Sequence, residues 1–202
     1  EADAGISLSR LALFAQSQAL TGLEFAHGIP GSLGGAVFMN AGAYGGEMKQ
    51  VVQEVIVLTE DGIRHIPGAE CAFGYRKSAF TDGKTVILGA KLHLKKGDPA
   101  QIRDKMAELM AKRKASQPLE YPSAGSTFKR PEGYYAGTLI QETGLKGLTV
   151  GGAQVSEKHA GFVINTGGAT CADVMALIAQ VQDRVMQRSG IHLEPEVRII
   201  EN

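Results

Sequence analysis

The sequence is poor in several features that define particular classes of protein. Among its 202 residues are only two cysteines, Cys71 and Cys171, with no CxxC pair, which favours reduced thiols over a disulfide or a metal site. Basic and acidic residues are balanced at 21 each, so no basic excess points to nucleic acid or a membrane surface as a partner. No apolar run reaches the roughly 20 residues that span a bilayer, and no signal-peptide pattern is seen in the given residues, although a missing N-terminus would hide one. These absences favour a cytoplasmic α+β protein.

Common catalytic and ligand-binding motifs are also missing. The five histidines show no metal-ligand spacing, so no metal site is expected. The glycines form neither a Walker A loop nor a dinucleotide-binding fingerprint framed by a βαβ pattern. No GxSxG motif surrounds Ser126, which leaves serine-hydrolase chemistry with weak support.

Glycine is abundant, at 26 residues, and seven of these lie between Gly28 and Gly46. Glycine allows positive φ angles and lets the backbone approach a ligand closely. The segment could bind phosphate oxygens through its amides or lie along a flat ring system. A plain glycine-rich loop is an equally good interpretation of this composition.

Hydrophobic periodicity predicts the elements of the first half. We expect a helix over Ser7–Leu20 that ends at Gly22, and a hairpin of Val51–Leu58 with Ile63–Ile66. A strand is predicted over Val86–Lys95. Asp98-Pro99 should then open a helix, because aspartate caps helices and proline suits their first position.

The second half reads as two helices and two strands. The predicted helices are Ala136–Thr143 and Cys171–Arg188, the latter stopped by Gly190. Ala160–Asn165 is predicted as a short strand, and Ile191–Ile200 alternates like one, although its proline restricts it to an edge or a bulge. A domain boundary is expected between about residues 97 and 116.

Three polar residues far apart in the chain could share an active site: Arg76, Ser126 and Glu196. Arginine binds carboxylates bidentately, whereas a serine hydroxyl is so weak an acid that it protonates only a strongly basic carbon. Each has a simpler explanation when taken alone. Arg76 could be a surface arginine, Ser126 a turn residue, and Glu196 with Arg198 a solvent-exposed ion pair on one strand face.

The order of motifs along the chain resembles the MurB family, the UDP-N-acetylenolpyruvoylglucosamine reductases. The resemblance covers essentially the whole chain. It rests on Gly28-Ile29-Pro30-Gly31-Ser32, Gly42-Ala43-Tyr44-Gly45, Gly74-Tyr75-Arg76-Lys77-Ser78, Ala124-Gly125-Ser126-Thr127-Phe128-Lys129, Leu145-Lys146-Gly147 and Leu193-Glu194-Pro195-Glu196-Val197-Arg198.

This resemblance implies a two-step hydride relay, in which NADPH reduces FAD and the reduced flavin passes hydride to an enolpyruvyl ether. Arg76 and Glu196 resemble the pair that stabilises the charge developing beside the substrate carboxylate. Ser126 resembles the hydroxyl that protonates the resulting carbanion. Glu196 would assist an anion only in its protonated form, which burial favours and the nearby Arg198 disfavours.

The resemblance also implies contacts to the cofactor and the substrate. The expected FAD contacts are Gly28, Ile29, Pro30, Gly31, Ser32, Ala41, Gly42, Arg113 and Arg198. The expected UDP-sugar contacts are Tyr44, Lys114, Arg130 and Lys146.

The implied fold is α+β: the remainder of a vanillyl-alcohol-oxidase-type (PCMH) FAD-binding domain over residues 1–100, then a smaller MurB C-terminal substrate domain over 101–202. The last strand, 191–202, is expected to return toward the flavin. The short span from Arg76 to Ser126 resembles the family type without an extra substrate-capping loop. The family's first lobe, with its pyrophosphate loop, has no counterpart here, so an N-terminally truncated chain is expected. The alternative is a flavin-free UDP-sugar-binding fragment without activity.

Overall fold

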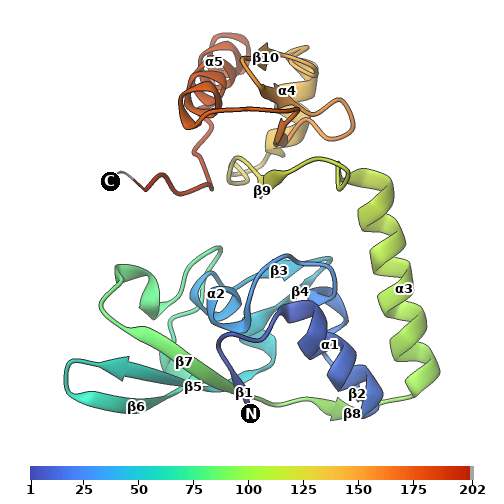
Figure 1. Ribbon diagram of the computed structural model, residues 1–202, viewed down its shortest axis with the longest axis vertical. Helices are drawn as coiled ribbons and strands as arrows, with labels where there is room; N and C mark the ends of the chain where they lie inside the picture. The colour runs from blue at the N-terminus through green and yellow to red at the C-terminus, as the bar shows by residue number, and fades with distance from the viewer. Residues whose placement is uncertain (201–202) are drawn as a thin grey trace. The chain divides into compact units, whose positions relative to one another are not determined.

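The computed structural model describes residues 1–200, which fold as two compact units (Figure 1). Unit 1 is Glu1–Arg113 and unit 2 is Lys114–Asn202, so the division falls inside the last turns of one long helix. Within residues 1–200, no helix has the length and apolar character needed to cross a membrane. The two units are described separately below.

Unit 1 is built on an antiparallel sheet with strand order β1-β7-β5-β6. Helix α2 packs against β7, and α1 packs against β2. The elements of this unit are β1 (Ala2–Asp3), α1 (Leu8–Ser17), β2 (Leu20–Thr21), η1 (Glu24–Ala26), α2 (Leu33–Phe38), β3 (Gly42–Ala43), β4 (Gly46–Glu47), η2 (Met48–Gln50), β5 (Val52–Thr59), β6 (Gly62–Pro67), η3 (Gly68–Glu70), η4 (Ala79–Asp82), β7 (Val86–Leu92), β8 (Lys95–Lys96) and most of α3 (Pro99–Ser116).

Helix α1 confirms the first predicted helix but ends earlier than expected. The Ser7 hydroxyl accepts a hydrogen bond from the Arg10 amide (3.4 Å) and caps the helix, which buries Leu8, Leu11, Ala12 and Ala15. The helix ends at Ser17 because Ala19 turns into the left-handed region, with φ 54°. The predicted stop at Gly22 is therefore wrong by several residues, and Leu20–Thr21 pairs with β8 instead.

The predicted hairpin is confirmed as β5 and β6, which pair from Glu54↔Pro67 to Thr59↔Gly62. The single strand predicted over Val86–Lys95 is instead two elements. β7 pairs with β5 up to Val52↔Leu92, and β8 then pairs with β2. Apolar and polar residues continue to alternate from β7 to β8, because the chain stays extended where its pairing partner changes.

Helix α3 begins where Asp98-Pro99 predicts. The Asp98 Oδ1 atom accepts from the Ala100 amide (2.7 Å) and satisfies a donor of the first turn. Ile102, Met106 and Leu109 are buried as expected. Arg113, on the same stripe near the end of the helix, is buried as well.

Unit 2 has a second antiparallel sheet, of order β10-β11-β12-β9, packed against α5. Both predicted helices are confirmed, and α5 is capped by the Thr170 hydroxyl at its start and by Gly190 (φ 70°) at its end. Its elements are β9 (Ser123–Ser126), α4 (Ala136–Glu142), β10 (Thr149–Val150), β11 (Ala153–Val155), β12 (Phe162–Asn165) and α5 (Cys171–Ser189).

The predicted strand over Ile191–Ile200 is wrong as a continuous strand. Within the described residues its sheet contact is one bridge, Phe128↔Pro195. Pro195 has no amide hydrogen to donate, which limits any ladder at this position. The predicted alternation partly persists, since Leu193 is fully buried in the core of unit 2. Residues 201–202 of the predicted strand lie outside the described residues.

Candidate functional site

Ser126 is the last residue of β9, so its prediction as a turn residue is wrong. It pairs with Phe162 of β12, and the preceding Gly125 adopts φ 86°. The Ser126 side chain is exposed. A rigid strand end therefore presents this hydroxyl to solvent, rather than a loop.

Glu196 lies beside the residues that follow Ser126. The Glu196 amide donates to the Thr127 carbonyl (2.8 Å), and the Lys129 amide donates to the Glu194 carbonyl (2.8 Å). These bonds align residues 194–196 against residues 127–129. The structure thus brings Ser126 and Glu196 into one neighbourhood of unit 2, with the Glu196 residue half-buried.

Thr127 holds the neighbourhood of Ser126 and Glu196 in place through its hydrogen bonds. It is 3% exposed, its amide donates to the Gly161 carbonyl (2.8 Å), and its hydroxyl accepts from the Val163 amide (3.0 Å). Since Thr127 is bonded to β12 on one side and to Glu196 on the other, Ser126 and Glu196 rest on a hydrogen-bonded backbone.

Arg76 occupies a tight turn in unit 1. Gly74 and Lys77 exchange backbone hydrogen bonds across it, and the Ala79 amide closes a wider loop onto the Cys71 carbonyl (2.7 Å). Arg76 has φ 54°, a left-handed conformation that is uncommon for a non-glycine residue. Its half-buried side chain lies 5.2 Å from the centre of the Tyr75 ring. Because Arg76 and Ser126 belong to different units, a site shared between them stays a prediction.

The predicted substrate residue Tyr44 lies at the tip of the hairpin formed by β3 and β4. Tyr44 and Gly45 both have positive φ, 53° and 83°, as a two-residue type I′ turn requires. A side chain on Gly42 would meet the Gly46 carbonyl, and one on Gly46 would meet the Phe25 ring. Two of the glycines in the sequence segment are therefore needed for packing of this hairpin.

Arg113 connects α3 to the glycine-rich segment. It is 6% exposed and lies 5.4 Å from the centre of the Tyr44 ring, and a side chain on Gly28 (φ 84°) would clash with Met110 and lie close to Arg113. The pKa of the neighbouring His27 is lowered, first by burial and second by the charge of Arg113. A predicted cofactor residue and a predicted substrate residue are thus already in contact within unit 1.

The segment from Gly28 to Ser32 suits a ligand that approaches backbone. Gly31 is exposed with φ 142°, and a side chain placed on it would meet nothing within 4 Å. Pro30 is exposed, whereas Ile29 packs against the core. The Ser32 hydroxyl caps α2 by accepting from the Gly35 amide (3.3 Å). Open space beside a glycine backbone fits a flavin nucleotide, although Ser32 uses its side chain for the helix.

Ala41 lies between α2 and the Tyr44 hairpin and makes two backbone hydrogen bonds. Its amide donates to the Ala36 carbonyl (2.8 Å), and its carbonyl accepts from the Met48 amide (3.0 Å). Ala41 and Gly42 are both half-buried. Their backbone is therefore fixed between α2 and η2.

The remaining predicted ligand residues lie on unit 2. The Arg130 guanidinium stacks over Tyr135, 4.0 Å from the ring centre. Lys146 is half-buried after α4, where its charge adds to burial, the larger cause, in lowering the pKa of His159. The side chain of Lys114 is exposed, and its carbonyl accepts from Lys158 Nζ (2.8 Å). Arg198 is exposed near the end of the described chain.

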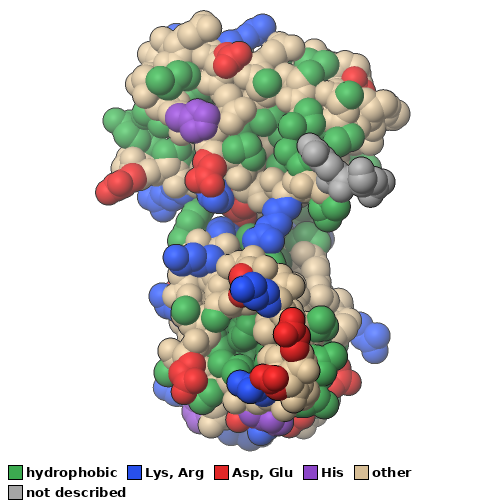
Figure 2. Space-filling view, turned by 90° about the vertical axis from the view of Figure 1, so that its left-hand side faces the viewer, with side chains coloured by type: hydrophobic (Ala, Val, Ile, Leu, Met, Phe, Trp, Pro, Cys, Tyr) green, Lys and Arg blue, Asp and Glu red, His purple; other side chains and the backbone are tan. Residues whose placement is uncertain are grey.

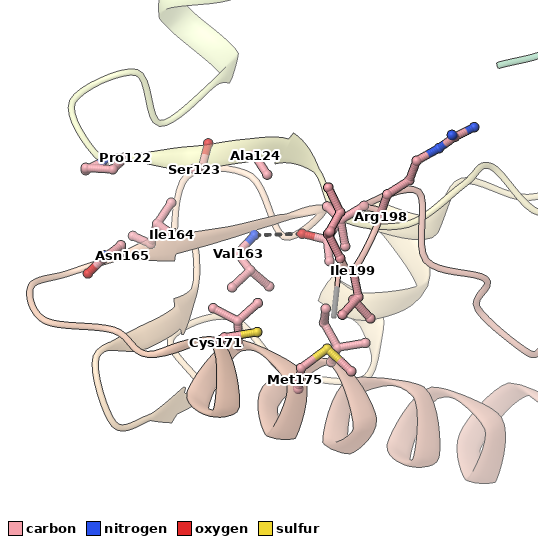
Figure 3. A pocket seen from close by; sticks show the side chains of 15 residues that line it. Pro122, Ser123, Ala124, Val163, Ile164, Asn165, Cys171, Met175, Arg198 and Ile199 are labelled. Atoms are coloured by element: carbon pink, nitrogen blue, oxygen red, sulfur yellow. Dashed lines mark hydrogen bonds between the residues drawn. The ribbon is translucent and has the colours of Figure 1, made fainter. Parts of the chain in front are cut away.

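A cavity of about 490 Å³ opens between β9, β12 and the start of α5. Figure 3 shows Val163, Cys171 and Met175 facing this space from the strand and the helix, while the Arg198 side chain points away from it. Its lining is mainly aliphatic and includes none of the three predicted catalytic residues. The cavity is therefore not the predicted substrate site.

The distribution of charged side chains and of possible metal ligands does not locate the functional site any further. On the face of unit 1 shown in Figure 2, basic and acidic side chains are interspersed. Across residues 1–200 no group of three or more His, Cys, Asp or Glu side chains is placed to hold a metal ion.

Sequence reasoning missed two buried polar residues of unit 1. The Asn40 side chain donates to the Gly74 carbonyl (3.0 Å), and the Ser78 hydroxyl donates to the Phe38 carbonyl (2.8 Å). Both bonds tie the Arg76 turn to the end of α2. The available signals were the place of Ser78 at the end of the Arg76 motif and that of Asn40 next to Ala41, an expected flavin contact.

Two family models match the chain. Residues 1–66 match an FAD binding domain, and residues 117–200 match the C-terminal domain of UDP-N-acetylenolpyruvoylglucosamine reductase. Each match falls within one structural unit, and the first contains the glycine-rich segment.

Relatives and a solved structure agree with these matches. The UDP-N-acetylenolpyruvoylglucosamine reductase of Pediococcus pentosaceus is 56% identical over 200 residues, and that of Caldanaerobacter subterraneus is 54% identical. Both alignments cover 98% of this chain but only 67% and 66% of the relatives, so the chain spans about two thirds of their length. The crystal structure of the reductase MurB from Thermus caldophilus superposes with a TM-score of 0.85 at 39% identity, covering 95% of this chain and 68% of that one. The chain therefore belongs to the UDP-N-acetylenolpyruvoylglucosamine reductase family.

Proposed function

We propose that this chain carries out the NADPH-dependent, FAD-mediated reduction of the enolpyruvyl group of UDP-N-acetylglucosamine enolpyruvate. The product is UDP-N-acetylmuramate, so the reaction serves peptidoglycan precursor synthesis in the cytoplasm, and through it cell shape and division. The observation that carries this proposal is the 56% identity to a reductase of that name over nearly the whole chain.

The cofactor supplies one part of the chemistry. Bound FAD would supply the hydride transfer, from NADPH to the terminal vinyl carbon of the substrate. The open backbone at Gly31 supports a flavin site on unit 1. We assign Gly28–Ser32, Ala41, Gly42 and Arg113 to that site, and the contact of Arg198, on unit 2, with the flavin stays a prediction.

The chain's own residues stabilise the developing charge and supply the proton. Hydride addition leaves an electron pair on the carbon beside the substrate carboxylate, where it delocalises into that group. Arg76, as a permanent cation, stabilises the carboxylate, and Glu196 is assigned to the same developing charge. Ser126 gives its hydroxyl proton to the carbanion and recovers one from solvent, since its side chain is exposed.

Binding of the UDP-sugar is assigned to four residues. Tyr44 offers an exposed ring on unit 1, and Arg130, Lys146 and Lys114 offer cations on unit 2 for the diphosphate. The stacking of Arg130 on Tyr135 holds its guanidinium in one plane, which suits bidentate binding of phosphate oxygens.

The test is the colour and turnover of the purified protein. We expect a yellow protein that oxidises NADPH when the enolpyruvyl sugar is added, and not when UDP-N-acetylglucosamine is added instead. A colourless protein that still binds the UDP-sugar would support the flavin-free fragment. A yellow protein that ignores the enolpyruvyl sugar would contradict the proposed substrate.

A further inference from the structure

Asn40 is one of few buried polar residues in unit 1, at 1% exposure. Its Nδ2 atom donates to Glu47 Oε2 (2.9 Å) and to the Gly74 carbonyl (3.0 Å), while its Oδ1 atom accepts from the Lys49 amide (2.9 Å). Two acceptors face the amide nitrogen and a donor faces its oxygen, which fixes the orientation of the amide group. With φ 43°, the position also favours asparagine among non-glycine residues.

These three bonds connect segments that carry different predicted roles. Asn40 lies between α2 and the expected flavin contacts Ala41 and Gly42. Glu47 and Lys49 end the hairpin that carries Tyr44. The Gly74 carbonyl belongs to the Arg76 turn and also accepts from the Lys77 amide (3.4 Å). One buried side chain therefore links the flavin segment, the Tyr44 hairpin and the Arg76 turn.

The link to Gly74 bears directly on the conformation of Arg76. A left-handed arginine costs free energy, on the order of 1 kcal/mol, so the turn keeps it only if its surroundings hold it. Ser78 anchors the far side of the turn to the Phe38 carbonyl (2.8 Å), and Asn40 anchors the near side. Without Asn40, the Gly74 carbonyl would keep the bond from the Lys77 amide but lose its link to the segment that follows α2.

We propose that Asn40 is a positioning residue that holds the Arg76 turn, and hence the Arg76 guanidinium, in the conformation used to stabilise substrate charge. The proposal rests on the proposed function for its kinetic consequence, but not for its structural one. Asn40 acts through Arg76, so its effect on chemistry should vanish when Arg76 is absent.

The structural arm uses trypsin, which cleaves after Arg76 and Lys77. In Asn40→Ser, loss of a buried bond worth about 1–3 kcal/mol should raise local opening, and thus cleavage in this turn, about 5- to 100-fold. Cleavage after Lys105 in α3 serves as the internal reference. Asn40→Asp, which keeps the acceptor for Lys49 but loses both donors, is the second variant and should give the same local increase.

Asn165→Ser is the matched control. Asn165 also bonds backbone groups through its side chain, its Oδ1 atom accepting from the Gly167 (2.8 Å) and Ala169 (3.1 Å) amides, but in unit 2. It should lower the melting temperature without raising the relative cleavage at Arg76 and Lys77. Unchanged relative cleavage in both Asn40 variants would overturn the proposal whether or not the protein is an active reductase.

The kinetic arm measures reoxidation of reduced flavin by the enolpyruvyl sugar in the flavin-loaded protein. Asn40→Ser should slow this step about 10- to 100-fold through misplacement of Arg76, while flavin reduction by NADPH stays near the wild-type rate. In an Arg76→Ala background the same substitution should slow it no further. Additive losses of the reoxidation rate in the double variant would overturn the proposal. If wild type shows no reoxidation by the enolpyruvyl sugar, the proposed function is contradicted. The trypsin experiment then decides the role of Asn40.

Discussion

In unit 1 the Arg76 turn is tied down by two buried side chains, Asn40 and Ser78, whereas in unit 2 Ser126 and Glu196 are aligned by backbone hydrogen bonds around Thr127. The difference predicts how each half responds to mutation. Side-chain anchors are lost with one substitution, but a backbone alignment survives most side-chain changes. The arginine should therefore be easier to displace than the serine and glutamate.

Within unit 1, the largest effect is expected from Arg76 itself. Arg76→Ala should slow flavin reoxidation by the enolpyruvyl sugar about 10²- to 10³-fold, because a charge-stabilising group is lost where charge develops. Lys77→Ala is the control, since it removes an exposed cation from the same turn. Equal losses in the two variants, measured by anaerobic stopped flow, would mean that only the general charge of the turn matters.

A moderate effect on stability is expected from acidification of unit 2. Burial lowers the pKa of His159, and its Nδ1 atom accepts from the Gly161 amide (3.1 Å), which requires an unprotonated nitrogen. The folded state thus favours the neutral ring, so this stabilisation is present above the unfolded-state pKa and is lost as pH falls below it.

Urea unfolding at about pH 8 and about pH 5.5 measures this dependence. His159→Asn should flatten the fall in the free energy of unfolding between the two pH values. His27 in unit 1, whose pKa is also lowered, should account for part of what remains. A fall as steep in His159→Asn as in wild type would refute the role assigned to the ring.

The smallest effect is expected at the ion pair of Lys129 with Glu194. This pair bridges the two segments that align Ser126 and Glu196, but the Glu194 side chain is 64% exposed. Glu194→Ala should therefore change the free energy of unfolding by about 1 kcal/mol or less and leave flavin reoxidation within about twofold of wild type. A large kinetic loss would show that a side-chain contact, rather than the backbone, sets this alignment.

Local signals in the sequence predicted much of the fold. Helices α3 and α5 follow from caps and periodic apolar residues, and the β5–β6 hairpin from alternation around a short turn. These features depend on residues within a few positions of one another. The continuous strand predicted at the C-terminal end was wrong because Pro195 cannot extend a ladder, and α1 ended early because Ala19 adopts a positive φ.

The candidate site residues could be selected from the sequence, but the side chains that support them could not. Arg76, Ser126 and Glu196 were selected from motif order, and the structure places Ser126 beside Glu196. Asn40 and Ser78 were missed because their partners lie 34 and 40 residues away in the chain, and no periodicity records such contacts. Long-range hydrogen bonds become visible only when the fold brings both ends together.

The most direct test of the account is the reaction of Ser126→Ala in its two half-reactions. Flavin reduction by NADPH should proceed near the wild-type rate, while reoxidation by the enolpyruvyl sugar should fall about 10²- to 10⁴-fold, as expected for loss of a general acid. Equal losses in both half-reactions would contradict the assignment of Ser126 as the proton donor to carbon.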